Sequence, residues 1–266
     1  MTNVKPKKPT NKDVARLAGV SVATVSYVIN GRKDQKISEE TKNKVLHAVN
    51  FLGYVPNLHA VAMKASVKSI VIRMSKHNGF LQDAEALLFA KELTELCKDG
   101  EYTVTLSAET EPSRVSATAC VCIGMTDEEF HDCAKENFIP FISVDTILND
   151  PFFYQITTDY EKIKADAETK FGQDYAFVTL KPNDTSLERE ILSAFPKVVF
   201  IDKLDDLKNL EDTRVVFGNL IFSELSVDER FRTVEKFKSK LKTILECVNK
   251  AVSRENVSDE SHYIKV

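Results

Sequence analysis

The sequence predicts an α/β protein in which a small N-terminal unit of three helices precedes a larger body built on a parallel sheet. Residues 10–56 hold three short amphipathic helix patterns in succession, whereas residues 69–266 alternate strand and helix patterns. The charge divides near the same boundary: residues 1–65 hold eleven basic and four acidic residues, a net charge of +7, and the remainder carries −11. We therefore expect a flexible basic arm over residues 1–9, a head over residues 10–56, a linker over residues 57–68 and a body over the rest.

The first helix of the head is expected to begin at Thr10. Thr10 and Asp13 have the spacing of a capping box, in which side-chain oxygens satisfy amide groups left free at a helix start. The residues that follow form a narrow apolar stripe, namely Val14, Leu17 and Ala18. Gly19 then supplies the backbone freedom that a sharp turn into the next helix needs.

The second helix is expected to start at Ser21, a favourable N-cap residue, and to end at Asn30-Gly31. Its two faces differ in chemistry. The inward face consists of Val25, Val28 and Ile29, and the outward face of Val22, Ala23, Ser26 and Tyr27. A solvated helix usually carries Glu and Lys on its outer face, so small and hydrogen-bonding groups beside a basic loop favour a surface that reads DNA over a structural bundle.

A third helix is expected to start at Ser38, with Glu39 and Glu40 well placed in its first turn. Its apolar residues close the small core of the head, and they are Val45, Leu46, Val49 and Leu52. Gly53 ends the helix. The head is thus a three-helix unit with a turn between its first two helices, and its positive charge suits a polyanionic partner.

The body alternates short apolar runs with amphipathic stretches, which predicts a parallel sheet covered by helices. The expected strands are 69–72, 102–106, 119–123, 140–144, 175–180, 198–201 and 214–217. The expected helices are 81–98, 127–135, 159–171, 187–195 and a long one over 227–252. The aromatic run at residues 152–154 is read as core packing, with stacking on a sugar ring as the alternative.

The string DVARLAGVSVATVSYVING at residues 13–31, followed by ISEETKNKV and LGYVPN, resembles the N-terminus of the bacterial LacI/GalR regulators. The resemblance implies a helix-turn-helix DNA-binding domain, a hinge helix and then a shortened periplasmic-binding-protein-like domain that binds an effector and dimerises. It implies a homodimer that binds a near-palindromic double-stranded operator.

Carried over position by position, the resemblance places Val22, Ala23 and Tyr27 against bases. Tyr27 stands where many members have an arginine, so the preferred operator should differ from theirs, because tyrosine offers one hydroxyl and a ring instead of a bidentate fork. The residues expected at phosphates are Ser21, Thr24, Ser26, Asn30 and Lys36. The residues expected in the hinge helix and minor groove are Asn57, Ala60 and Met63, with Met63 at the wedge position.

Two residues of the body are expected at an effector site. Asp145 follows a buried strand, where open sheets bind ligands, although a carboxylate that merely forms a turn is an equal alternative. Arg189 matches an arginine that holds ligand hydroxyls in the family, but its acidic neighbours also suit a solvated helix. The resemblance implies a small-molecule effector such as a sugar or sugar phosphate.

Other classes of protein are disfavoured by the sequence. We find no catalytic constellation, no phosphate-binding glycine loop, no cofactor motif and no metal-ligand spacing among the five histidines and five cysteines. The cysteines are read as reduced thiols. No apolar run is long enough to span a membrane, and the N-terminus lacks the apolar core of a signal peptide, so a cytoplasmic location is expected.

The sequence therefore predicts a DNA-binding transcriptional regulator, most simply a repressor, that a carbohydrate-like metabolite modulates. An alternative from another class is a regulator controlled by a protein partner or by no ligand, whose body serves only dimerisation or protein contact. An enzyme on the same fold is disfavoured because the catalytic residues are missing.

Overall fold

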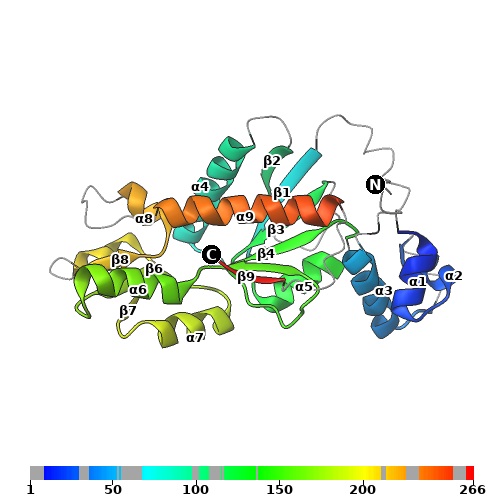
Figure 1. The fold of residues 1–266 in the computed structure, drawn as a ribbon, viewed down its shortest axis with the longest axis horizontal. Helices are drawn as coiled ribbons and strands as arrows, with labels where there is room; N and C mark the ends of the chain where they lie inside the picture. Colours follow the sequence, from blue (N-terminus) through cyan, green and yellow to red (C-terminus); the bar gives the residue numbers. More distant parts are fainter. Residues whose placement is uncertain are drawn as a thin grey trace, which may run out of the picture.

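The computed structural model describes the head and most of the body. The ranges it describes are 9–29, 36–52, 54, 68–97, 102–107, 115, 117–135, 137–210, 214–225, 234–253 and 262–266. The head lies at one end of an elongated molecule whose body has two lobes (Figure 1). The α/β class and the order of a three-helix head before a parallel-sheet body are confirmed. Residues 1–8 of the basic arm, Asn30 and the hinge residues Asn57, Ala60 and Met63 lie outside the described ranges.

Three helices form the head, namely α1 (Asn11–Ala18), α2 (Val22–Ile29) and α3 (Glu39–Leu52). Asp13 accepts hydrogen bonds from both the amide and the hydroxyl of Thr10, at 2.9 and 2.7 Å, which fixes the start of α1. Gly19 ends it in the left-handed region at φ 66°. The Ser21 hydroxyl accepts the Thr24 amide at 3.0 Å and so caps α2, as expected.

The core of the head is small and aliphatic. Val14, Val25 and Val45 come from the three different helices, and each is completely buried. Burying a valine side chain stabilises a fold by roughly 1.5–3 kcal/mol, so these contacts hold the short helices together. The inward face expected for α2 is therefore confirmed, and its outward face is left at the surface.

The first lobe of the body is a parallel sheet of six strands in the order β2-β1-β3-β4-β5-β9. The strands are β1 (Lys68–Met74), β2 (Tyr102–Ser107), β3 (Ala119–Ile123), β4 (Phe141–Val144), β5 (Tyr154–Thr157) and β9 (Tyr263–Lys265). One face packs on α4 (Phe80–Leu96) and α9 (Val234–Ser253), and the other on α5 (Asp127–Lys135). Because both faces are covered, the central strands are continuous apolar runs.

The second lobe is a parallel sheet of three strands in the order β7-β6-β8. These strands are β6 (Ala176–Leu180), β7 (Val198–Ile201), followed by the 3₁₀ helix η3 (Leu204–Leu210), and β8 (Val215–Phe217). One face packs on α6 (Tyr160–Phe171) and α7 (Thr185–Ala194), and the other on α8 (Leu220–Leu225) and the first turns of α4. Helix α4 thus contributes to the cores of both lobes.

The expected rhythm of the body is largely confirmed, with additions. Strands β5 and β9 and the short helices η3 and α8 were not predicted. The five cysteines are free and buried, in keeping with reduced thiols. Within the ranges that the structure describes, no helix is long and apolar enough to cross a membrane.

Candidate functional sites

The outward face of α2 is the first candidate site. Val22 is 42 % exposed and Ala23 is also exposed, whereas Val25 on the opposite face is completely buried. In Figure 1 this helix lies at the far end of the head, with α3 between it and the body. The body therefore leaves the outer face of α2 accessible to a large partner.

The residues expected at DNA are arranged around this helix. Ser21 and Thr24 stand at its N-terminus with their hydroxyls 2.9 Å apart, and Ser26 and Tyr27 are half-buried along it. Lys36 is exposed just before α3. Small side chains, hydroxyls and a lysine can contact base edges and phosphates in a groove wide enough to admit a helix.

The second candidate site is a cleft between the two lobes. It encloses a cavity of about 130 Å³, smaller than the roughly 300–1,000 Å³ typical of pockets for drug-sized ligands. Its polar lining includes Asn78, Gln82, Glu85, Asp145, Asn183 and Lys240. Phe89 of the first lobe and Leu180 of the second contribute apolar wall.

Direct hydrogen bonds join the lobes across this cleft. The Asn183 amide of the second lobe donates to the Asn78 side chain at 2.9 Å and to the Gly124 carbonyl at 3.0 Å. Glu85 on α4 accepts the amides of Leu220 and Ile221 at 2.9 and 2.7 Å. Burial raises the pKa of Glu85, against the lowering effect of those two amides. The lobes are therefore held together by groups of the chain itself.

Asp145 lies in the cleft, as predicted, but it already has a partner. Lys240 of α9 donates to its two carboxylate oxygens at 2.5 and 2.6 Å and to the Thr158 hydroxyl at 3.1 Å. Asp145 is also the single non-glycine residue with positive φ, at 55°, within the described ranges. A ligand hydroxyl at Asp145 would compete with this ammonium group.

Arg189 is not brought to the cleft. Its guanidinium donates to the Thr185 carbonyl of its own helix at 3.2 Å and remains exposed, as expected of a solvated helix charge. The polar groups of the cleft that sequence reasoning missed include Asn78, Gln82, Glu85, Asn183 and Lys240. A lysine inside an amphipathic helix carries no signal that it will turn inward. Among the described residues, no group of three or more His, Cys, Asp or Glu side chains could hold a metal ion.

In the comparison with known proteins, the family match lies in the head. Residues 10–57 match the family model "Bacterial regulatory proteins, lacI family". The chain is 33 % identical over 112 residues to the sucrose operon repressor of Klebsiella pneumoniae, covering 41 % of this chain and 32 % of that protein. It is 41 % identical over 99 residues to the transcriptional repressor PurR of Photobacterium profundum, covering 36 % and 28 %. The matched segments thus span less than a third of these relatives.

A solved structure was also aligned with the chain. The lac repressor dimer bound to operator and the anti-inducer ONPF aligns with a TM-score of 0.40 and 15 % sequence identity, covering 94 % of each chain.

Proposed function

We propose that this chain, whose residues 10–57 belong to the lacI family of bacterial regulatory proteins, is a sequence-specific DNA-binding transcriptional repressor. The observation that carries the proposal is α2, which is capped at its start by Ser21 and buries Val25 while leaving Val22 exposed. A helix anchored on one face and open on the other can enter a major groove. The sucrose operon repressor and PurR are named as repressors, which supports that direction of control.

On this proposal α2 reads bases through Val22, Ala23 and Tyr27. The residues assigned to phosphates are Ser21, Thr24, Ser26, Asn30 and Lys36. Phosphate contacts fix the register of the helix, and base contacts specify the sequence. The linker would supply Asn57, Ala60 and Met63 to the minor groove at the centre of the site.

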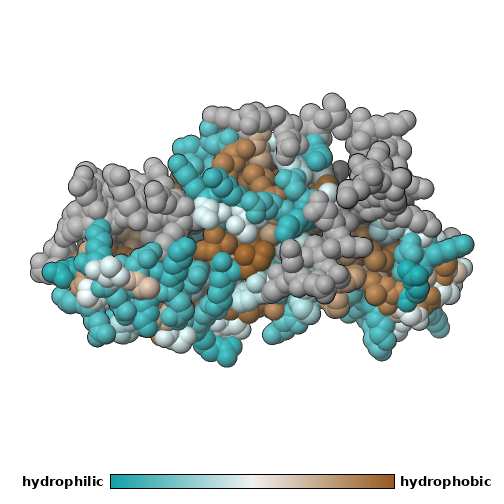
Figure 2. Space-filling view, viewed as in Figure 1, coloured by the Kyte–Doolittle hydropathy of each residue, from teal (hydrophilic) through white to brown (hydrophobic). Residues whose placement is uncertain are grey.

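A homodimer is part of the proposal because α4 carries an apolar face at the surface. Phe80 is 78 % exposed and Leu87 is 61 % exposed, and the charged Asp83 and Lys91 lie on the same face. The side of the molecule in Figure 2 also shows apolar residues over α4, whereas hydrophilic residues dominate over α6 and α7. Exposed apolar side chains rimmed by charges are typical of protein interfaces.

The charges on α4 favour one way of pairing two copies. Asp83 and Lys91 each lie four residues from Leu87, about 6 Å along the helix axis in opposite directions. Antiparallel pairing with Leu87 at the two-fold axis puts Asp83 of one copy level with Lys91 of the other, whereas parallel pairing opposes like charges.

The cleft is assigned to a small effector such as a sugar or sugar phosphate, with Asp145 accepting from the ligand. Binding would have to displace Lys240 from Asp145 and would favour one arrangement of the lobes. The second candidate is a regulator that needs no ligand. Two observations favour this candidate. Lys240 already occupies Asp145, and hydrogen bonds within the chain, such as Asn183 to Asn78, join the lobes without a ligand.

Two measurements test these proposals. Selection of duplexes from a random pool by the full chain should yield a near-palindromic sequence, and no enrichment at moderate salt would overturn the DNA-binding function. Calorimetry against a panel of sugars and sugar phosphates should then give heat with at least one compound. If no compound of the panel gives a heat of binding while operator binding is intact, the ligand-independent regulator is the correct candidate.

A further inference from the structure

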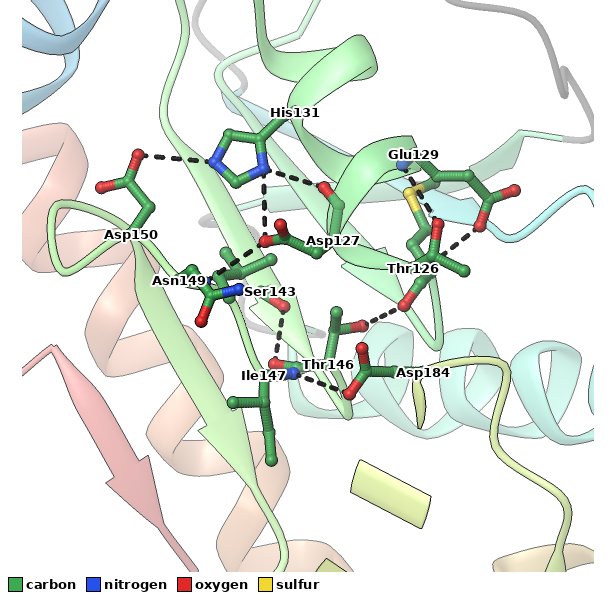
Figure 3. Close-up of polar contacts among 12 residues, drawn as sticks. Thr126, Asp127, Glu129, His131, Ser143, Thr146, Ile147, Asn149, Asp150 and Asp184 are labelled. Atoms are coloured by element: carbon green, nitrogen blue, oxygen red, sulfur yellow. Dashed lines mark hydrogen bonds and ion pairs between the residues drawn. The ribbon is translucent and has the colours of Figure 1, made fainter. Parts of the chain in front are cut away.

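One loop runs from the cleft between the lobes to the head. This β4–β5 loop, residues 145–153, leaves β4 at the cleft and enters β5 beside α3 of the head. Figure 3 shows its polar contacts, from Asp184 of the second lobe at one end to His131 and Asp150 at the other. A segment that touches both the cleft and the head can link their states.

The cleft end of the loop is tied to both lobes and to α9. Asp145 holds the buried ammonium of Lys240, and its left-handed backbone turns the chain sharply at this point. Two residues later, the amide of Ile147 donates to the carboxylate of Asp184, which caps α7 of the second lobe. A change in the Asp145–Lys240 pair or in the position of the second lobe therefore acts directly on the start of the loop.

The middle of the loop is fixed by hydrogen bonds to the first lobe. The Thr146 hydroxyl donates to the Met125 carbonyl at 2.7 Å, and the Leu148 amide donates to the Gln155 side chain at 2.8 Å. Gln155 in turn donates to the Asp150 carbonyl at 2.8 Å. A loop braced along its length transmits a displacement, because tightly packed structure does not absorb it locally.

The far end of the loop contacts the head. His47 of α3 lies with its Nδ1 3.5 Å from the Asp150 carboxylate, whose same oxygen is 3.4 Å from Nε2 of His131. The Phe152 ring meets His47 and Phe51 of α3 edge to face, each with ring centroids 5.6 Å apart. The head therefore rests on the body through α3, and in Figure 1 α2 lies on the far side of α3 from the body.

We propose that the β4–β5 loop couples the cleft to the orientation of the head: the Asp145–Lys240 pair positions Phe152 and Asp150 so that α3 docks on the body. The docked head presents α2 in a defined direction. Loss of the Asp145–Lys240 pair releases the head from the body. The regulatory role of this coupling rests on the proposed DNA-binding function. The docking of the head on the body does not depend on that function. The element with two states is the head, docked or detached, and both sites bias it.

The test follows the motion of the head by time-resolved fluorescence anisotropy on the full chain. A Lys12→Cys substitution on exposed α1 carries the dye, because the five native cysteines are buried. The otherwise unmodified chain should show only the slow decay of the whole molecule. Phe152→Ala removes both ring contacts, and we expect roughly tenfold more of the detached head, seen as a fast component. Leu192→Ala, an exposed apolar truncation on α7, is the matched control and should leave the decay unchanged.

Coupling to the cleft is tested with a second pair of variants. Lys240→Met keeps the length of the side chain but removes the ammonium from Asp145, and it should increase the detached head by roughly threefold or more. Lys181→Met removes a lysine from the same cleft that does not contact Asp145, and it should have no effect. The midpoint of thermal unfolding, measured for each variant, verifies that the body stays folded.

Three results would overturn the proposal. A fast component already present without Phe152→Ala would mean that the head is not docked. An unchanged decay in Phe152→Ala would mean that Phe152 does not hold it. Release by Phe152→Ala but not by a folded Lys240→Met would refute the coupling. The anisotropy experiment contains no DNA. A failure of the chain to bind any operator would therefore refute the proposed function without affecting the conclusion on docking.

Discussion

Reversal of one charge on α4 should weaken self-association, and reversal of its partner should restore it. In the antiparallel pairing, each dimer holds two Asp83–Lys91 contacts across the two-fold axis at Leu87. An exposed ion pair contributes about 0.2–1 kcal/mol, and like charges in the same place repel to a similar extent. Asp83→Lys changes both contacts, so we expect a loss of about 1–3 kcal/mol, roughly a 5- to 150-fold higher dimer dissociation constant.

Sedimentation equilibrium at low and high salt measures this directly. Lys91→Asp should weaken the dimer as much as Asp83→Lys, and the double variant should return close to the original dissociation constant, with all differences shrinking at high salt. Glu161→Lys, a reversal at an exposed position of α6, is the matched control and should change little. The pairing through Leu87 is wrong if both single variants dissociate like this control. It is also wrong if the double variant has a higher dissociation constant than either single variant.

Three further predictions concern the head and its contact with the body. Lys36→Ala should weaken binding to all duplexes alike and reduce the salt slope of log affinity by about one, so a sequence-dependent loss would argue against a phosphate contact. Ser21→Ala removes the acceptor of the Thr24 amide and should lower the free energy of unfolding by about 1 kcal/mol in urea denaturation; an unchanged value would mean that the cap contributes nothing. The hydrogen bond with Asp150 raises the pKa of His131, against the effect of burial, so protonation of His131 stabilises the fold below its unfolded pKa and this is lost as the pH rises through the folded pKa. Asp150→Asn should therefore lower the pKa of His131 in an NMR titration and destabilise the protein more at pH 5.5 than at pH 8; equal destabilisation at both would contradict that linkage.

The head could be predicted from the sequence almost completely. Its helices start at local signals, such as the Thr10–Asp13 pair and Ser21, and its core follows from helical periodicity within a short stretch. Such signals act over three or four residues and depend little on the rest of the fold. The central strands of the body were predictable for a similar reason, because strands covered on both faces are continuous apolar runs.

The cleft could be predicted only in part, because its residues come from distant segments. Asp145 was found because it follows an apolar strand, but Lys240 is 95 residues away on a helix whose sequence gives no sign of an inward-facing charge. Strand β9 is three residues long and gains its place by pairing with β5. The contact of His47 with Asp150 depends on how two folded units meet, which periodicity does not report.

The aromatic run at residues 152–154 illustrates the same limit. Phe153 and Tyr154 are buried in the body, as the core interpretation predicts. Phe152 stays 43 % exposed and faces α3 of the head. Phe153 also meets His47 of α3 edge to face, with ring centroids 6.4 Å apart. The two neighbouring phenylalanines thus differ in burial, and that difference arises from tertiary contact alone.

The central claim is that the outward face of α2 reads base edges, and the base preference of Tyr27 variants tests it most directly. With a selected operator and a full set of single-base variants, Tyr27→Ala should change the preference at one position of each half-site, while Tyr27→Phe should retain any part of that preference that arises from ring contact with a thymine methyl. The affinities for operators changed at any other position should all fall by the same factor or stay unchanged. Equal loss on every sequence for Tyr27→Ala, with no change in preference anywhere, would contradict the account.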